Sequence, residues 1–174
     1  MDRIEIEGAL RAVSDKLAGK GISGRIFIVG GAAMVLAFSS RFSTADVDAD
    51  FAPADDVRDA AKTVGAELGL PEDWLNDSVT IYLPSFKEPD WRPTLKFENL
   101  EVSTADARSL LAMKMRASRG SRDIGDIRLL LVQCGIRTES DALSLYEEYF
   151  PEDPIPERAT PLLRRALADN LQVS

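Results

Sequence analysis

The segment 44–51 constrains the fold more than any other part of the sequence, because its residue types alternate strictly. Three carboxylates occupy every second position and small or apolar residues fill the positions between them: Asp46, Asp48 and Asp50 against Ala45, Val47, Ala49 and Phe51. A period of two predicts a β-strand, whose successive side chains point to opposite faces of a sheet. Aspartate is depleted in strands, so three of them in alternation require a reason.

Asp46 and Asp48 are candidate metal ligands. On a strand they point to the same side, with Cβ atoms roughly 7 Å apart. Two carboxylates at that separation repel each other, and burying them costs free energy unless a cation binds. The alternative is a solvated acidic strand face, which the continuation of the series at Asp50 supports. Asp50 itself is expected to be peripheral to a metal site.

The remaining hydrophobic patterns predict strands early in the chain and helices late. Helices are expected over 3–19, 32–38, 56–69, 107–117, 124–135, 138–149 and 159–171, and strands over 25–29, 44–51, 79–83 and 94–102, the last as one strand or a hairpin. Asp55 is expected to cap the helix that begins at 56. This order predicts an α+β fold, in which a small mixed β-sheet is flanked by helices and followed by a helical C-terminal part. We expect residues 1–104 to form the core and residues 105–174 to pack on it as one continuous domain.

Gly30 and Gly31 lie between the expected strand 25–29 and the short helix that follows. Because glycine has no side chain, its backbone N–H groups can approach a phosphate, and the N-terminus of a helix favours negative charge. The turn is therefore a candidate phosphate grip. The alternative is an ordinary turn without a ligand.

Two absences narrow the chemistry of any site. The chain has no histidine and a single cysteine, Cys134, which excludes histidine-dependent triads and zinc sites built from His or several Cys. A bound metal is therefore expected to be a hard cation held by carboxylates, Mg²⁺ or Mn²⁺. The sequence shows no apolar run of the roughly 20 residues that a membrane span needs, no basic-then-apolar start and no cysteine pairs. We expect a cytoplasmic protein with no membrane partner.

A locally basic segment stands out in a chain of net charge −8. Between residues 106 and 128 there are six basic and three acidic residues, which indicates either a solvated helix face or a surface for phosphates. Lys114 lies within the apolar stretch LLAMKMRA. Its ammonium either reaches solvent along its aliphatic stem or faces a site and neutralises the β- and γ-phosphates of a nucleotide.

Asp123 and Asp126 follow on the next expected helix. They are three residues apart and therefore share a face of that helix. A role beside Lys114 is one interpretation of this pair. Helix capping, together with pairing to Arg122 or Arg128, is the other.

Together these motifs resemble one known family. The pattern GG…RFSTADVD, followed much later by LLAMKMRASRGSRDIGDIRLLL, is similar to that of the AbiEii/MenT-type nucleotidyltransferase toxins and their uncharacterised relatives. In that family a GG or GS turn precedes a D-x-D strand, and a helical K-x-x-A segment leads into R-D-x-x-D and a leucine-rich helix. The resemblance covers residues 25–51 and 100–132 well and residues 52–99 poorly.

The resemblance implies a Mg²⁺-dependent enzyme that transfers a nucleoside monophosphate from an NTP to an acceptor hydroxyl. The implied acceptor is the 3′ end of a tRNA or another RNA, and the implied role is that of a bacterial toxin restrained by a cognate antitoxin. By position, Asp46 and Asp48 resemble the metal-binding pair, Lys114 the phosphate-binding lysine and Asp126 the last motif carboxylate, with Asp123 its close alternate. The other expected substrate contacts are Gly30, Gly31, Arg41, Ser43, Thr44 and Arg116.

Two further expectations follow from the same resemblance. The hydroxyl of Thr44, two residues before Asp46, becomes a target of phosphorylation by the antitoxin, which would add negative charge beside two carboxylates. Many nucleotidyltransferases also carry a third metal carboxylate on a central strand. In this sequence only Glu98 or Glu101 could take that place, and neither is well marked.

Two alternatives remain open from the sequence. The first keeps the fold but changes the acceptor to a protein hydroxyl or a small molecule such as an aminoglycoside, because the basic patch is modest. The second is a degenerate domain that binds a nucleotide or a partner protein without turnover, which the weakly marked third carboxylate supports. Screening of acceptors tests the first, and Mg²⁺-dependent NTP binding without turnover would identify the second.

Overall fold

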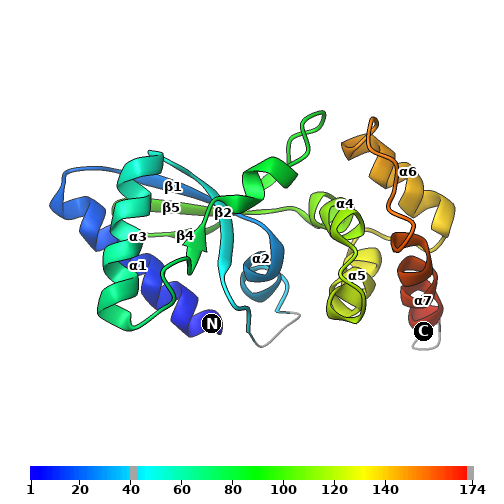
Figure 1. Ribbon diagram of the computed structural model, residues 1–174, viewed down its shortest axis with the longest axis horizontal. Helices are drawn as coiled ribbons and strands as arrows, with labels where there is room; N and C mark the ends of the chain where they lie inside the picture. Colours follow the sequence, from blue (N-terminus) through cyan, green and yellow to red (C-terminus); the bar gives the residue numbers. More distant parts are fainter. Residues whose placement is uncertain (40–42, 172–174) are drawn as a thin grey trace. The chain divides into compact units, whose positions relative to one another are not determined.

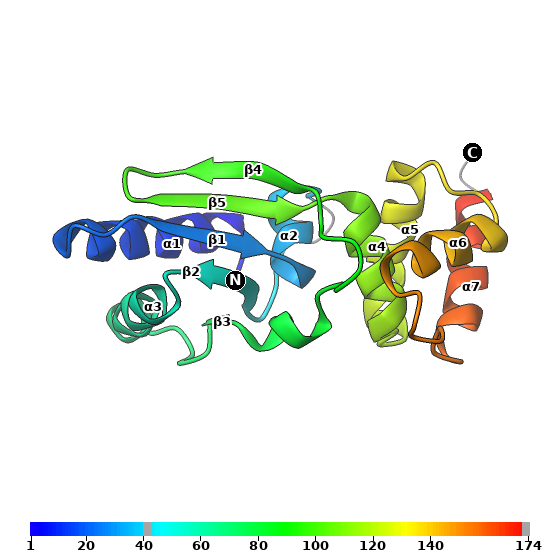
Figure 2. The same ribbon diagram turned by 90° about the horizontal axis from the view of Figure 1, so that it is seen from above.

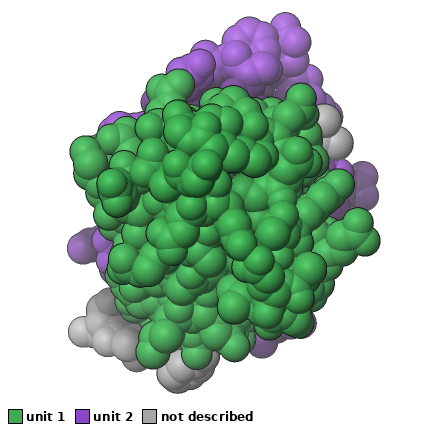
Figure 3. All heavy atoms as spheres, turned by 90° about the vertical axis from the view of Figure 1, so that its left-hand side faces the viewer, with its two compact units in different colours: residues 1–81, 91–105 green, residues 82–90, 106–174 purple. Residues whose placement is uncertain are grey.

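The computed structural model describes residues 1–39 and 43–171. As predicted, the architecture is α+β: the described residues form seven α-helices and a five-stranded mixed sheet. The chain divides into two compact units, shown in two colours in Figure 3. One contains Met1–Ile81 and Trp91–Ala105 and is called the sheet unit, and the other contains Tyr82–Asp90 and Asp106–Ser174 and is called the helical unit.

The sheet unit is built on five strands in the order β3-β2-β1-β5-β4. Strand β1 is antiparallel to β2 and parallel to β5, β3 joins β2 in parallel, and β4 joins β5 as an antiparallel hairpin, as Figure 2 shows. The strands are β1 (Gly24–Ile28), β2 (Val47–Ala52), β3 (Leu75–Asn76), β4 (Trp91–Lys96) and β5 (Leu100–Ala105).

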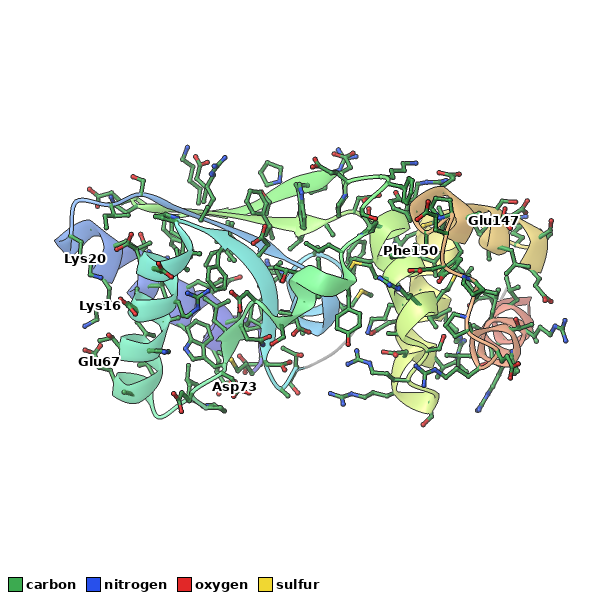
Figure 4. All side chains as sticks on the ribbon, turned by 45° about the horizontal axis from the view of Figure 1, so that its top comes forward. Lys16, Lys20, Glu67, Asp73, Glu147 and Phe150 are labelled. Atoms are coloured by element: carbon green, nitrogen blue, oxygen red, sulfur yellow. The ribbon has the colours of Figure 1, made fainter. Side chains whose placement is uncertain are left out.

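One face of this sheet is packed and the other carries the polar side chains. In β2, Val47, Ala49 and Phe51 are buried, whereas Asp50 is exposed. Helices α1 (Arg3–Gly19) and α3 (Ala54–Leu68) pack against each other and against strands β5 and β2, and they cover the apolar face (Figure 1). At their surface, Lys16 Nζ of α1 lies 2.5 Å from a carboxylate oxygen of Glu67 of α3, and both are labelled in Figure 4.

Both edges of the sheet are short or irregular. Strand β3 has two residues. Strand β4 contains Pro93, which has no N–H to donate, and its register with β5 shifts between Pro93 and Leu95. Lys96 ends the strand with a charged, exposed side chain. These features leave few regularly spaced N–H and C=O groups at either edge.

The helical unit consists of α4 (Ala107–Ala117), α5 (Ser121–Gln133), α6 (Glu139–Tyr149) and α7 (Ala159–Leu171). Two of these helices begin at side-chain caps: Asp106 accepts a hydrogen bond from the backbone N–H of Arg108 at 3.1 Å, and Thr138 accepts one from Asp141 at 3.1 Å. Helix α5 packs on α4 and α7. Within the described ranges, no helix of either unit has the length and apolar character needed to cross a membrane.

Most of the predicted elements are confirmed, with boundaries shifted by a few residues. The predicted strand 94–102 is the hairpin of β4 and β5. Strand β2 begins at Val47 rather than Thr44, because Thr44 lies in the preceding loop. The prediction that Asp55 caps α3 is wrong: Pro53 is the N-cap residue and Asp55 lies in the first turn, where its charge still favours the helix N-terminus.

The predicted strand 79–83 is also wrong, because Ser78–Tyr82 forms a 3-10 helix. Local hydrogen bonds explain the difference. The backbone N–H and the hydroxyl of Thr80 both donate to the carbonyl oxygen of Asp77, at 3.1 and 2.8 Å. These bonds hold the chain in a tight turn against its β-propensity. The short strand β3 lies just before this turn and was not predicted.

Cys134 provides a test of burial in the helical unit. It is the C-terminal cap residue of α5, and burial raises the pKa of its thiol to about 11, with Asp106 adding to the effect and Arg108 opposing it. The reactive species is the thiolate. We therefore expect alkylation by iodoacetamide at pH 8 to be roughly 10- to 100-fold slower in the folded protein than in urea, where the pKa returns to about 8.5. Equal rates in the two conditions would contradict this assignment.

Candidate functional site

The structure brings the predicted Gly-Gly turn against one of the predicted metal ligands. At the end of the β1–β2 ladder, the backbone N–H of Val29 donates to the carbonyl of Asp48 at 3.0 Å. Gly30 follows with φ of +63°, and a Cβ atom built there would lie 2.9 Å from Asp48 Oδ2. Other residues are strained at this φ, and a Cβ atom would force the Asp48 carboxylate to shift. Gly31, the next residue, is buried in the first turn of α2 (Gly30–Leu36).

The two candidate ligands remain partly exposed. Asp46 directly precedes β2 and Asp48 is the second residue of that strand. Asp50 lies opposite Phe27, one step further from Gly30 along the ladder. The alternation predicted for this segment is confirmed from Val47 to Phe51, where apolar residues are buried and the carboxylates are not.

A hard divalent cation fits this donor set. Carboxylate oxygens are the ligands that Mg²⁺ prefers, and it usually keeps several water or phosphate oxygens around one or two protein carboxylates. In the part of the chain that the structure describes, no group of three or more side chains forms a metal site by itself. Asp46 and Asp48 would therefore hold a metal together with oxygens of a substrate.

Asn76 is a neighbour of this site that the sequence did not indicate. It lies beside Asp48 in the parallel pairing of β2 and β3, so both side chains point to the same face of the sheet. Its side-chain oxygen accepts a hydrogen bond from the backbone N–H of Ser78 at 3.1 Å. Strand β3 is two residues long, too short for a periodic pattern, and no sequence signal could have placed Asn76 beside Asp48.

Three other predicted contacts precede Asp46 in the chain. Thr44 is buried, with 9% of its surface exposed, and its backbone N–H donates to the carbonyl of Met1 at 2.8 Å. Ser43 is exposed. Arg41 lies outside the described residues. The predicted roles of these residues in binding a nucleotide stay predictions.

Neither candidate for a third metal carboxylate lies beside the pair. Glu98 is exposed in the turn between β4 and β5. Glu101 lies on β5 next to Arg25, which pairs on its other side with Ala52 of β2. Ala52 is four residues beyond Asp48, roughly 13 Å along the strand. Glu101 is instead paired with Lys96 at 3.2 Å.

Lys114 of the helical unit is buried in an ion cluster. Its side chain is 3% exposed, and Nζ lies 2.8 Å from Asp123 Oδ1 and 2.8 Å from Asp126 Oδ2. The interpretation that this lysine reaches solvent is therefore wrong. The prediction that Asp123 and Asp126 share a helix face is confirmed, because both carboxylates reach the same ammonium across the α4–α5 hairpin.

Arg119 completes this cluster from the turn between the two helices. Its backbone N–H and its Nε both donate to Asp123 Oδ2, at 2.9 and 3.2 Å. Ser118 and Gly120 on either side have φ of 44° and 68°, which makes the turn tight. Burial by itself would raise the pKa of Asp123, but the hydrogen bonds and charges of Lys114 and Arg119 outweigh it and lower that pKa.

Acidification is expected to weaken this cluster. The pKa of Asp123 in the folded protein lies below the value of about 3.9 for an unfolded chain. Such a carboxylate contributes stability that is present above the unfolded pKa and is lost as the pH falls through the folded one. We expect the difference in unfolding free energy between wild type and Asp123→Asn to be constant near neutral pH and to shrink below about pH 4. Urea denaturation across this range measures it, and a difference unchanged by acid would contradict the assignment.

Arg116, a predicted substrate contact, has protein partners in the helical unit. Its guanidinium lies 2.7 Å from Asp153 Oδ2 and 4.7 Å from the ring centroid of Phe150, which Figure 4 labels. One face of the guanidinium is thus stacked on an aromatic ring and one edge is neutralised. A phosphate would have to compete with Asp153 for this arginine.

The site residues thus fall into two groups. Gly30 and Asp48 come together in the sheet unit, with Gly31 next to Gly30 and Asp46 two residues before Asp48 in the chain. Lys114, Asp123 and Asp126 come together in the helical unit. Comparisons of the chain with models of protein families, with curated proteins and with solved structures found no match.

Proposed function

We propose that the chain is a Mg²⁺-dependent nucleotidyltransferase, which moves a nucleoside monophosphate from an NTP to an acceptor hydroxyl. The observation that carries this proposal is the approach of Gly30 to Asp48, where a Cβ atom would lie 2.9 Å from the carboxylate. This approach brings together two motifs that are separate in the sequence, the Gly-Gly turn and the alternating aspartates. The backbone of a glycine turn can approach a phosphate, and the partly exposed carboxylates of Asp46 and Asp48 can bind a cation.

Asp46 and Asp48 would hold the metal, which supplies positive charge for the leaving pyrophosphate. The carboxylates would fix where the triphosphate binds, next to the glycine turn. Arg41, Ser43 and Thr44, which precede Asp46 in the chain, would contact the nucleotide. The acceptor hydroxyl would be oriented toward the α-phosphate for an in-line displacement.

The resemblance to the AbiEii/MenT-type toxins supports a role for Lys114 in neutralising phosphate charge, with Asp126 and its alternate Asp123 as the last motif carboxylates. In the structure both carboxylates already bind its ammonium, at 2.8 Å each.

The acceptor is proposed to be the 3′ end of a tRNA or another RNA. The exposed side chains of Arg119 and Arg122 support this proposal, because RNA backbones are bound by arginine and lysine. The resemblance to the AbiEii/MenT-type toxins further supports a toxin role under the control of an antitoxin, with Thr44 as the residue that the antitoxin would phosphorylate.

A transfer assay tests the proposal. Purified protein is incubated with Mg²⁺, each of the four labelled NTPs and total bacterial tRNA, with an EDTA control and with Asp46→Ala protein as the negative control. Label on the tRNA that requires Mg²⁺ and Asp46 is the expected result. Label on protein or on an aminoglycoside, with none on RNA, would keep the reaction and replace the acceptor. Absence of transfer to every acceptor would overturn the proposal.

A second candidate is a degenerate domain that binds an NTP without turnover. Two observations favour it: neither Glu98 nor Glu101 lies beside Asp46 and Asp48, and Lys114 is held by carboxylates of its own unit. Its signature would be Mg²⁺-dependent NTP binding in equilibrium dialysis with no pyrophosphate released in the presence of any acceptor.

A further inference from the structure

An aromatic pair lies on the sheet face that α1 and α3 leave uncovered. The rings of Phe27 on β1 and Trp91 on β4 have centroids 5.1 Å apart and planes inclined at 53°. Both side chains are partly exposed. Arg25 is exposed on the same face, with its guanidinium carbon 5.9 Å from the Phe27 ring centroid. The core of the unit does not account for this cluster, because the core lies on the other face.

The register of the sheet places this pair close to the candidate metal ligands. Phe27 lies directly opposite Asp50 of β2, so Asp48 is its diagonal neighbour, about 7–8 Å away. On its other side Phe27 pairs with Ser103 of β5, whose side chain is also partly exposed. Phe27 therefore lies from Asp48 at about the distance that separates a nucleobase from its phosphates, and the partly exposed side chain of Ser103 flanks its ring.

The charges on this face select the kind of ligand. Arg25 and Lys96 are balanced there by Asp50 and Glu101, the latter paired with Lys96 at 3.2 Å. Acidic residues also outnumber basic ones in the sheet unit as a whole. A nucleic-acid strand needs a row of cations for its phosphates, and the described residues of this face form no such row. An uncharged flat ring needs only an aromatic surface and a few polar groups.

We infer that Phe27 and Trp91 form a stacking platform for the nucleobase of the NTP whose phosphates bind at Gly30, Asp46 and Asp48. The inference rests on the proposed function for the triphosphate end of the ligand. Stacking tolerates any base, since every base has a π face. We therefore expect all four NTPs to bind, with purines stronger than pyrimidines because their larger rings cover more of the aromatic pair.

Affinities for ATP and for tripolyphosphate, each measured with Mg²⁺, distinguish the contribution of the platform from that of the phosphate site. Calorimetric titration of Trp91→Leu and Phe27→Leu proteins is expected to show ATP affinity lowered roughly 5- to 100-fold, with tripolyphosphate affinity unchanged. The matched control is Phe97→Leu, because Phe97 also lies under an arginine, Arg11, at 5.0 Å, but in the turn between β4 and β5. Its ATP affinity is expected to equal that of the wild type.

Tryptophan fluorescence gives a second readout that requires no substitution. Trp74 is fully buried, and the chain has two tryptophans, so quenching by acrylamide reports mainly on Trp91. Saturating ATP is expected to protect Trp91 from acrylamide, whereas tripolyphosphate is not.

The outcomes separate this inference from the proposed function. ATP that binds equally well to the wild type and to both platform variants would overturn the platform and leave the proposed function standing. Platform-dependent binding of adenosine, with no gain from its phosphates and no transfer, would support the platform and overturn the proposed function. Protection of Trp91 by a single-stranded oligonucleotide but not by ATP would show that the platform binds a nucleic-acid strand and not a mononucleotide, which would overturn the inference.

Discussion

Replacing Asp46 by alanine is expected to abolish nucleotidyl transfer and to leave the protein folded. The loss of rate should be about 10³-fold or more, because a metal contributes several kcal/mol to the transition state and each 1.36 kcal/mol is about one decade. The side chain is partly exposed, and the residue directly precedes β2. Its removal relieves repulsion with Asp48, so the free energy of unfolding should stay within about 0.5 kcal/mol of the wild type or increase.

Asp50→Ala is the matched control for this prediction. Asp50 lies on the same face of the same strand, but its exposed side chain is one step further from Gly30 than Asp48. We expect it to keep most of the transfer activity. Rates are compared with radiolabelled NTP under saturating Mg²⁺, with stability followed by urea denaturation. Full activity of Asp46→Ala in a clean assay would show that the proposed mechanism is wrong.

Replacing Lys114 by methionine is expected to destabilise the protein by about 3–5 kcal/mol, because it leaves buried carboxylates without their cation. Asp123 is completely buried and Asp126 is 3% exposed. Methionine fills a similar volume, so the loss reports the charge rather than a cavity. Urea denaturation at neutral pH measures the effect. The additional substitution Asp123→Asn is expected to recover part of the loss, since it removes one of the stranded charges.

The matched control is an exposed ion pair of the same unit. Arg128 NH1 lies 3.6 Å from Asp169 Oδ2, with both side chains more than a third exposed. Arg128→Met is therefore expected to cost less than about 1 kcal/mol. If Lys114→Met costs no more than this control, the cluster contributes little to stability. In that case any loss of transfer in Lys114→Met would reflect the chemistry of the lysine alone.

Local patterns in the sequence predicted most of this fold, because the deciding interactions are local. Apolar residues at helical spacing located α1 and α4 to α7, and strict alternation located β2. The same approach failed for residues 78–82, whose β-branched and aromatic residues favour a strand. There the hydrogen bonds from Thr80 to the carbonyl of Asp77 fix a 3-10 helix, and propensity does not count such bonds.

The candidate site was predictable residue by residue but not as an arrangement. Alternation alone identified Asp46 and Asp48. The approach of Asp48 to the backbone at Gly30 depends on the antiparallel register of β1 and β2, and no single segment encodes that register. Likewise, helical spacing showed that Asp123 and Asp126 share a face. The contact of this helix face with the buried Lys114 depends on the tight turn at Ser118 and Gly120, which folds α5 back on α4.

The two edges of the sheet have a consequence for behaviour in concentrated solution. Strands with free edges recruit strands of other molecules and start aggregates. In this protein the edge strand β3 offers a second molecule two residues for pairing. At the edge strand β4, a proline, an irregular register and the charged Lys96 oppose pairing. The sheet therefore carries a polar face without offering its edge backbone as a template for fibre growth.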